Sequence, residues 1–294
     1  MATYLKPDST KILNGVTVHE YLLTKHNPNK IAMPTGSMDG IVVGITVHNT
    51  ERIKVASATT PAEQYTRATY NGNMNDVRVH LYTDDICAWQ NLPFTLPGWH
   101  AADGSGNGNR KTIAIECIMS SRYDDKDKKS EDNCARLAAY LLHQYGLGVE
   151  NLYTHTHWLN VRDGKAGTTD ELNVMHHSKK MCPAYILPHW NEFKAKVATY
   201  LNGIAATEKK ETTQNLYRIR KAWDDADSQT GAYAGLQGAI EKCKESGNEY
   251  KVFDSEGKIV YSAENEESAE DSTFSLDINI AGEKYVVEGE LKKA

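Results

Sequence analysis

The sequence predicts an α/β domain of about 200 residues, followed by a smaller α+β domain. Apolar runs such as 41–47 are of strand length and lack polar alternation, which is typical of strands covered on both faces. Segments with amphipathic helical spacing separate these runs. Residues 207–214 are polar and charged with no apolar period, which predicts a linker. Because 294 residues suffice for two domains, we expect them at 1–206 and 215–294, joined by 207–214.

In the first domain, five segments have the length and composition of strands. They are a central strand at 41–47 that ends at His48, a hairpin formed by 77–82 and 86–90, a buried strand at 112–118, and a short strand at 152–154 that runs into His155. Three helices are expected. The first is capped by Thr60, with Pro61 and the capping-box residue Glu63 in its first turn. The second is capped by Ser130 and stops at Gly146, and the third spans 190–201. Residues 97–110 are rich in glycine and asparagine and predict a loop.

The second domain has its own sequence pattern. It predicts a strand at 216–221, a helix at 235–244, a hairpin at 250–261, an acidic spacer at 264–271 and a second hairpin at 274–287.

Composition excludes several classes of function. The net charge of -6, with basic and acidic residues interspersed, argues against a nucleic-acid partner. No apolar stretch approaches the roughly 20 residues of a membrane span. The N-terminus shows no basic region followed by an apolar run, so we expect no secretory signal and a chain made in the cytoplasm. Five widely spaced cysteines fit reduced thiols better than disulfides.

Three potential metal ligands follow strand or loop signals. His48 and His155 each end a predicted strand, and Cys182 lies in a loop before a helix. Two neutral imidazoles and a thiolate leave the fourth position of a tetrahedral site open to water, as in catalytic zinc sites. A histidine alone is weak support, because most histidines are surface residues or hydrogen-bonded core residues.

Four motifs carry a resemblance to a known family: 45–50 (ITVHNT), 106–117 (GNGNRKTIAIEC), 154–158 (THTHW) and 180–183 (KMCP). The residues of these motifs and the order of the motifs along the chain resemble those of type-2 N-acetylmuramoyl-L-alanine amidases, above all phage endolysins of Gram-positive hosts. The resemblance covers about residues 40–203. The resemblance implies the peptidoglycan-recognition fold, in which helices flank a mixed central sheet. It also implies peptidoglycan as the substrate and, after release of the enzyme from the cell, lysis of the bacterial wall.

Carried onto matching positions, the resemblance implies that His48, His155 and Cys182 bind Zn²⁺. It implies that Glu116 is the general base and that Lys180 stabilises the developing oxyanion. Glu116 in a structural ion pair and Lys180 as a solvated surface residue are the alternatives.

The spacing of the ligands departs from the family. In the related endolysins only a short loop separates the second histidine from the cysteine, whereas 26 residues lie between His155 and Cys182. The extra material is roughly 159–177, which we expect on the rim of the cleft, where it would shape peptide specificity. His157, His176 and His177 lie nearby and remain alternative ligands.

His80 and His100 fall where the family lines its substrate groove, so we expect them to contact substrate or to support residues that do, with simple packing as the alternative. We also expect Trp99 to contact substrate by stacking on a sugar, with a place in the core as the alternative. Cys87, Cys117 and Cys134 are interpreted as small buried hydrophobic residues.

The segments 216–223 and 231–233 resemble modules appended to wall hydrolases, which implies that the second domain binds a cell-wall polymer. A module that only stabilises or oligomerises the enzyme is the alternative.

Three functions therefore compete: hydrolysis of the bond between N-acetylmuramic acid and L-alanine, binding of muropeptides without cleavage, and a metallo-amidase for another amide. Non-catalytic relatives typically lose the cysteine ligand, so the presence of Cys182 favours catalysis.

Overall fold

The computed structural model describes residues 4–56, 58–175, 180–214, 216–233, 235–262, 272–280 and 283–291. The chain divides into two compact units, Met1–Ala205 and Ala206–Ala294. No helix among the described residues is long and apolar enough to cross a membrane.

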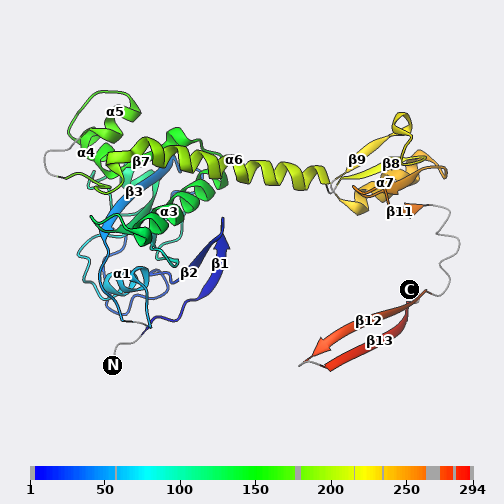
Figure 1. The fold of residues 1–294 in the computed structure, drawn as a ribbon, viewed down its shortest axis with the longest axis horizontal. Coiled ribbons are helices and arrows are strands. Elements are labelled where there is room, and N and C mark those ends of the chain that lie inside the picture. The colour runs from blue at the N-terminus through cyan, green and yellow to red at the C-terminus, as the bar shows by residue number, and fades with distance from the viewer. Residues whose placement is uncertain are drawn as a thin grey trace. The chain divides into compact units, whose positions relative to one another are not determined.

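The first unit is built on a seven-stranded mixed sheet with the order β1-β2-β5-β4-β6-β3-β7. Figure 1 labels β1, β2, β3 and β7 of this sheet. The strands are β1 (Ser9–Leu13), β2 (Val16–Glu20), β3 (Gly44–Glu51), β4 (Leu81–Thr83), β5 (Ala88–Gln90), β6 (Thr112–Met119) and β7 (Leu152–Thr154). The pairs β1–β2 and β4–β5 are antiparallel, and the other neighbours are parallel. The expected mixed α/β architecture is therefore confirmed.

Helices cover both faces of this sheet. They are α1 (Pro61–Tyr70), α2 (Asn107–Lys111), α3 (Asp125–Gln144), α4 (His155–Arg162), α5 (Thr169–Val174) and α6 (Trp190–Gln214), with short 3-10 turns at Val149–Asn151 and Leu187–His189. The main core joins α3 and α6 to one face of the sheet, and a smaller core joins α1 to the other.

Side chains alternate between the two faces along each strand. Ile45 and Val47 of β3, and Ile113 and Ile115 of β6, belong to the main core on the α3 and α6 side. His48, the residue after Val47, therefore belongs to the face that α1 covers.

Two predicted boundaries around this face were wrong. The strand expected at 41–47 begins at Gly44 and runs to Glu51, because β6 continues to Met119 and pairs with it throughout. His48 therefore lies within β3 rather than at its end, and β3 is next to the edge strand of the sheet rather than at its centre. The loop expected at 97–110 contains the start of α2, since the carboxylate of Asp103 accepts hydrogen bonds from the N–H groups of its first turn.

Two helix boundaries were also wrong. The helix expected to start at Ser130 begins at Asp125, because Asp124 and Asp127 form a capping box that the sequence analysis overlooked. Ser130 lies inside α3, where its hydroxyl donates to Ile118 O. The last helix, expected to end at residue 201, continues through 207–214, so the predicted linker segment is helical. Its glutamate, lysine and glutamine residues have high helix propensity.

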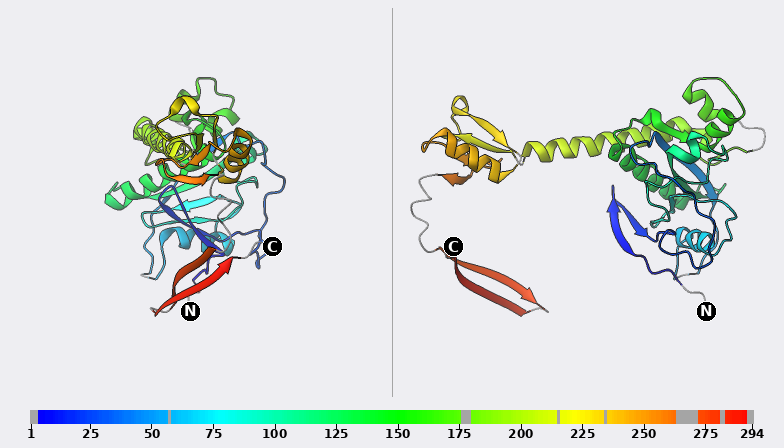
Figure 2. Two further views of the ribbon diagram at one scale, coloured as in Figure 1. Left: turned by 90° about the vertical axis from the view of Figure 1, so that its right-hand side faces the viewer. Right: turned by 180° about the vertical axis from the view of Figure 1, so that it is seen from behind.

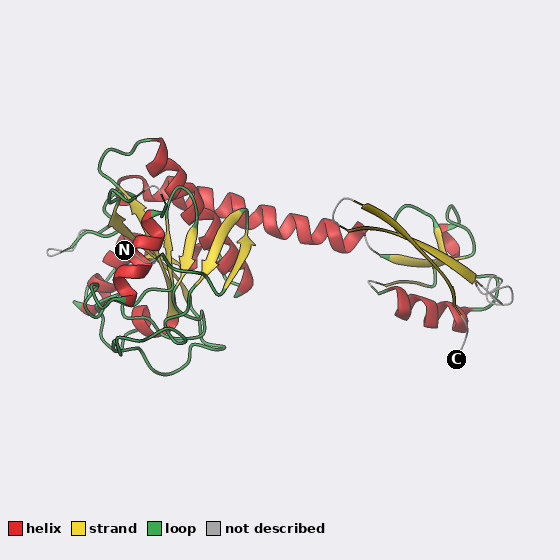
Figure 3. Cartoon of the chain, turned by 90° about the horizontal axis from the view of Figure 1, so that it is seen from below, coloured by secondary structure: helices red, strands yellow, loops and turns green. Residues whose placement is uncertain are grey.

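The second unit contains a helix and a four-stranded sheet with the order β11-β10-β8-β9. Figures 2 and 3 show the strands and the helix of this unit. Its elements are β8 (Tyr217–Arg220), a 3-10 turn (Ala226–Ser228), β9 (Gly231–Tyr233), α7 (Leu236–Ser246), β10 (Lys251–Phe253) and β11 (Ile259–Ser262). Ile219 and Val252 of the sheet pack against Ala239 and Cys243 of α7. The second predicted hairpin is also present, as the antiparallel pair β12 (Ser272–Ile280) and β13 (Glu283–Leu291). The acidic spacer at 264–271 lies outside the described residues.

The strand β9 was not predicted, because three residues are too few for a recognisable alternation.

Candidate metal centre and active site

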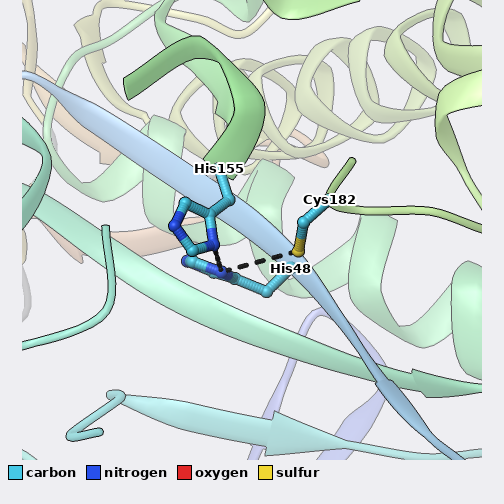
Figure 4. Close-up of side chains that lie close together, drawn as sticks. All are labelled: His48, His155 and Cys182. Carbon is cyan, nitrogen blue, oxygen red and sulfur yellow. Dashed lines mark hydrogen bonds between the residues drawn. The ribbon is translucent and has the colours of Figure 1, made fainter. Parts of the chain in front are cut away.

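Three potential metal ligands lie close together, and Figure 4 shows their side chains pointing toward one another. His48 comes from β3, His155 is the first residue of α4, and Cys182 lies in the loop before α6. The Nδ1 atoms of the two histidines are 3.1 Å apart, and Cys182 Sγ is 3.9 Å from His48 Nδ1. All three donor atoms lie within 4.8 Å of one another, and no other such group occurs among the described residues.

Backbone pairing explains why these distant residues meet. The strand β7 pairs with β3 so that Thr154 lies opposite Val47. The residues that follow these two in the chain are the candidate ligands His155 and His48. Thr154 then caps α4 by accepting a hydrogen bond from His157 N.

Cys182 is held to the same helix by a second threonine. Thr156 N and Thr156 Oγ1 both donate to Cys182 O, and Cys182 N donates to Thr156 Oγ1 at 2.9 Å. These bonds hold together the two ends of the 26-residue segment that lies between His155 and Cys182. This role of Thr156 was not predicted, although Thr156 lies between the two histidines of the 154–158 motif.

The donor set fits a tetrahedral metal ion. Ideal zinc–ligand lengths place two nitrogen ligands about 3.3 Å apart and a nitrogen and a sulfur about 3.6 Å apart. The observed 3.1 and 3.9 Å are close to these values. The side chains are also almost fully removed from water, at 1% exposure for His48 and 3% for His155 and Cys182. The three residues could therefore hold a metal ion.

Electrostatics point the same way. Burial, followed by the neighbouring His155, His100 and Lys180, lowers the pKa of His48 well below its usual value, so its imidazole is neutral and able to bind a cation. Burial raises the pKa of the Cys182 thiol to about 12, and Glu116 adds to this shift while Lys180 opposes it. A buried thiol of this kind ionises readily only beside a strong positive charge, which a bound metal supplies.

The alternative ligand His157 lies on the same helix but outside this group. Its ring contacts Tyr153 and Trp158 instead, at centroid distances of 4.7 and 4.6 Å. The geometry therefore favours His155 over His157. His176 and His177 lie outside the described residues.

Glu116 lies directly opposite His48 in the pairing of β3 with β6. Its Oε1 atom is 4.0 Å from His48 Nδ1, and 13% of its side chain is exposed. The other carboxylate oxygen is buried and has no hydrogen-bond partner among the described residues. Burial raises the pKa of Glu116 to about 7, against the opposing charge of Lys180. A carboxyl group with this pKa can both take up and release a proton near neutral pH.

Lys180 is exposed, two residues before Cys182. Its charge acts on Glu116, Cys182 and His48, since it lowers the pKa of each. This influence places a positive charge near the donor set, and the role of Lys180 in catalysis stays a prediction.

The three residues predicted to contact substrate have different surroundings. His80 is fully buried, with Nε2 donating to Leu96 O at 2.8 Å and Nδ1 accepting from Ala114 N at 3.0 Å. Both of its ring nitrogens are thus engaged by the backbone, which favours packing over contact with substrate. Trp99 is half-buried and pairs through its backbone with Arg78. His100 is buried, and its Nδ1 atom lies 3.0 Å from Nε2 of His48.

The additional segment between the candidate ligands includes the second half of α4 and all of α5. Asn173 accepts a hydrogen bond from Thr154 N and donates to Leu152 O. Asn160 donates to Leu172 O and Met175 O, which ties α4 to α5. The segment therefore contacts the strand end from which His155 follows, a contact that the sequence analysis did not anticipate.

Together, the fold and the site define an α/β protein with a buried candidate metal centre beside a carboxyl group that can exchange protons. The family model for N-acetylmuramoyl-L-alanine amidase matches residues 38–184, which is half of the chain. The protein therefore belongs to the N-acetylmuramoyl-L-alanine amidase family.

Individual relatives agree with this family. The chain is 30% identical to N-acetylmuramoyl-L-alanine amidase XlyA of Bacillus subtilis (strain 168) over 154 residues, which cover 52% of this chain and 43% of XlyA. It is 31% identical to N-acetylmuramoyl-L-alanine amidase CwlH of the same strain over 172 residues, which cover 58% of this chain and 56% of CwlH. The chain thus spans about half the length of these curated relatives.

Similar solved structures include PlyL and the PlyG catalytic domain. PlyL has a TM-score of 0.48 and 26% identity, covering 62% of this chain and 98% of its own. The solution structure of the PlyG catalytic domain has a TM-score of 0.48 and 28% identity, covering 63% of this chain and 94% of its own.

Proposed function

We propose that this protein is a zinc-dependent amidase that hydrolyses the bond between N-acetylmuramic acid and L-alanine in peptidoglycan. The observation that carries the proposal is the buried donor set of His48, His155 and Cys182 beside Glu116, in a chain of the amidase family. The motif pattern further favours an endolysin-like role, in which cleavage of this bond lyses the bacterial wall.

The residues of the site have distinct tasks in this reaction. When bound, zinc would polarise the scissile carbonyl group and lower the pKa of a water molecule. Glu116 takes a proton from the attacking water and passes it to the departing amino group of L-alanine. Lys180 stabilises the negative charge that develops on the carbonyl oxygen. His48, His155 and Cys182 would hold the ion and leave one tetrahedral position open.

Binding of muropeptides without cleavage is the competing function. A binding protein needs no complete ligand set and no carboxyl group of perturbed pKa beside it. Because Cys182 is present and lies in place beside both histidines, the geometry favours catalysis.

Digestion of purified peptidoglycan tests the proposal. Mass spectrometry should detect new free amino termini of L-alanine after incubation with the full chain. A chelator should abolish this product, and added Zn²⁺ should restore it. Binding to peptidoglycan without new amino termini would favour the recognition protein, whereas bound zinc without wall cleavage would favour another amide substrate.

We also propose that the second unit binds a polymer of the cell wall. Ile219 and Val252 face α7, so Arg218 and Arg220 on β8 face the opposite side of the sheet. Both guanidinium groups lie over the ring of Trp223, at 5.8 and 5.3 Å from its centroid. Cations combined with an aromatic ring suit a polymer that carries phosphates or sugars.

Co-sedimentation with purified walls tests this second role. A Cys182→Ala full chain, made inactive so that it does not digest the walls, should pellet with them. Adding Arg218→Ala and Trp223→Ala should reduce the pelleted fraction, whereas Lys242→Ala on α7 should not. Equal pelleting of all variants would assign wall binding to another surface and would favour a stabilising or oligomerising module.

A further inference from the structure

His100 lies next to Nε2 of His48, whereas the other candidate ligands lie next to Nδ1 of the same ring. His48 directs Nδ1 toward His155 and Cys182, and its second nitrogen, Nε2, is 3.0 Å from Nδ1 of His100. The two rings are nearly perpendicular, with an interplanar angle of 88°. Both nitrogens of His48 are therefore committed, one to the metal centre and one to His100.

The hydrogen bond determines where the protons are. A neutral imidazole that binds a metal through Nδ1 carries its proton on Nε2. Nε2 of His48 then donates, and Nδ1 of His100 must be the acceptor. Within this pair, His100 stabilises the one tautomer of His48 that leaves Nδ1 free for a metal ion.

The backbone of His100 is itself fixed. Asn109 Oδ1 accepts hydrogen bonds from the N–H groups of His100 and Ala101, both at 2.8 Å. Asn109 Nδ2 donates to Gly104 O, and Asn109 N donates to Asp103 Oδ1. This arrangement accounts for Asn109 in the 106–117 motif, which the proposed catalytic mechanism does not use.

Glycine at position 98 makes room for the ring. A Cβ atom there would lie 2.6 Å from Cδ2 of His100 and 3.0 Å from Arg78 O. Any side chain at this position would therefore displace the His100 ring or the neighbouring backbone.

We propose that His100 is a positioning residue that accepts the Nε2 hydrogen bond of His48 and thereby fixes the tautomer and ring orientation of this ligand. Asn109 holds His100 in place. The inference rests on the proposed function, since it takes His48 to be a metal ligand. Outer hydrogen-bond partners of ligating histidines typically change metal affinity by about 10- to 100-fold when they are removed.

Matched substitutions of His100 in the full chain test this role. In His100→Asn, the amide oxygen lies near the place of the lost Nδ1, whereas in His100→Gln it lies one bond further out. We expect zinc affinity, measured by competition with a chromophoric chelator, to stay near wild type in His100→Asn. It should fall in His100→Gln, and about 10- to 100-fold in His100→Leu. Asn109→Ala should also weaken binding, and His157→Leu, which removes a buried histidine outside the site, should not.

Co²⁺ supplies a readout of ligand geometry that is independent of activity. The visible absorption of the Co²⁺-loaded chain should shift in His100→Leu and Asn109→Ala and stay unchanged in His157→Leu. Equal zinc affinity in His100→Asn and His100→Gln would overturn the proposal, even if His100→Leu fails to fold. A wild-type chain that binds no zinc refutes the proposed function itself, whereas normal zinc binding in all His100 variants refutes only this inference.

Discussion

Replacing Glu116 with glutamine separates catalysis from metal binding. The amide has the shape of the carboxyl group but cannot accept a proton from water at neutral pH. Glu116 Oε1 is 4.0 Å from His48 Nδ1, which is too far for a hydrogen bond, and Glu116 is outside the donor set. We therefore expect Glu116→Gln to bind one zinc ion, as the wild-type chain should.

The size of the effect follows from the role of the group. Loss of a general acid or base typically lowers turnover by about 10²- to 10⁴-fold. This corresponds to about 2.7–5.4 kcal/mol of transition-state stabilisation, at about 1.36 kcal/mol per factor of ten. The stability of the fold should not fall together with turnover. Burial raises the pKa of Glu116 to about 7, so its ionised form opposes folding above that pH, and the neutral amide should leave the unfolding free energy at pH 8 unchanged or increased.

Three measurements on one preparation decide the matter: zinc content, release of L-alanine amino termini, and urea denaturation at pH 8. Glu131→Gln is the matched control, because Glu131 is also buried but forms ion pairs with Lys196 and His189. This control should lose stability and retain turnover. Near-normal turnover in Glu116→Gln would reduce Glu116 to a structural residue, and loss of zinc together with activity would equally refute the proposed division of roles.

Three further predictions follow from the geometry. His155→Ala and Cys182→Ala should lose zinc while His157→Ala retains it, and metal analysis showing stoichiometric zinc in Cys182→Ala would contradict the assignment. Asn173→Ala leaves the buried Thr154 N–H unpaired and should lower the unfolding free energy by about 1–3 kcal/mol, as urea denaturation would show. A chain that ends after the first unit should hydrolyse soluble muropeptides but lyse whole cells more slowly, since a tethered module raises the effective enzyme concentration at the wall. If the second unit, fused to a fluorescent protein, does not sediment with walls and the shortened enzyme lyses cells at the full rate, that reasoning fails.

Much of the fold could be predicted from the sequence, because burial leaves a clear pattern. The hairpin of β4 and β5, the strands β6 and β7 and, except for β9, the order of the helix and strands in the second unit follow from apolar runs and turn residues. Boundaries failed where a polar side chain or a neighbouring strand decided them. Asp124 starts α3 through hydrogen bonds to its first turn, and β6 extends β3 beyond His48.

The sequence indicated the three candidate ligands of the site but not the residues that hold them in place. His48, His155 and Cys182 could be named because motifs preserve residue type and order, whatever the number of residues between them. The preference for His155 over His157 came from its place directly after the strand-end threonine, and the structure agrees with it because His155 and not His157 belongs to the group of donor atoms. The role of His100 stayed open, since no local pattern shows that its ring meets Nε2 of His48.

The additional segment illustrates a general reason for this limit. The strand β7 lies at an edge of the sheet, where one row of its backbone groups has no neighbouring strand. The side-chain amide of Asn173 takes the place of that strand by bonding to Thr154 N and Leu152 O. His155 follows directly, so the segment that lengthens the spacing between the ligands also fixes the backbone from which one of them projects. Apolar periodicity indicates which face of a strand is buried, but it does not show which distant amide will complete its edge. Contacts of this kind have to be read from the structure.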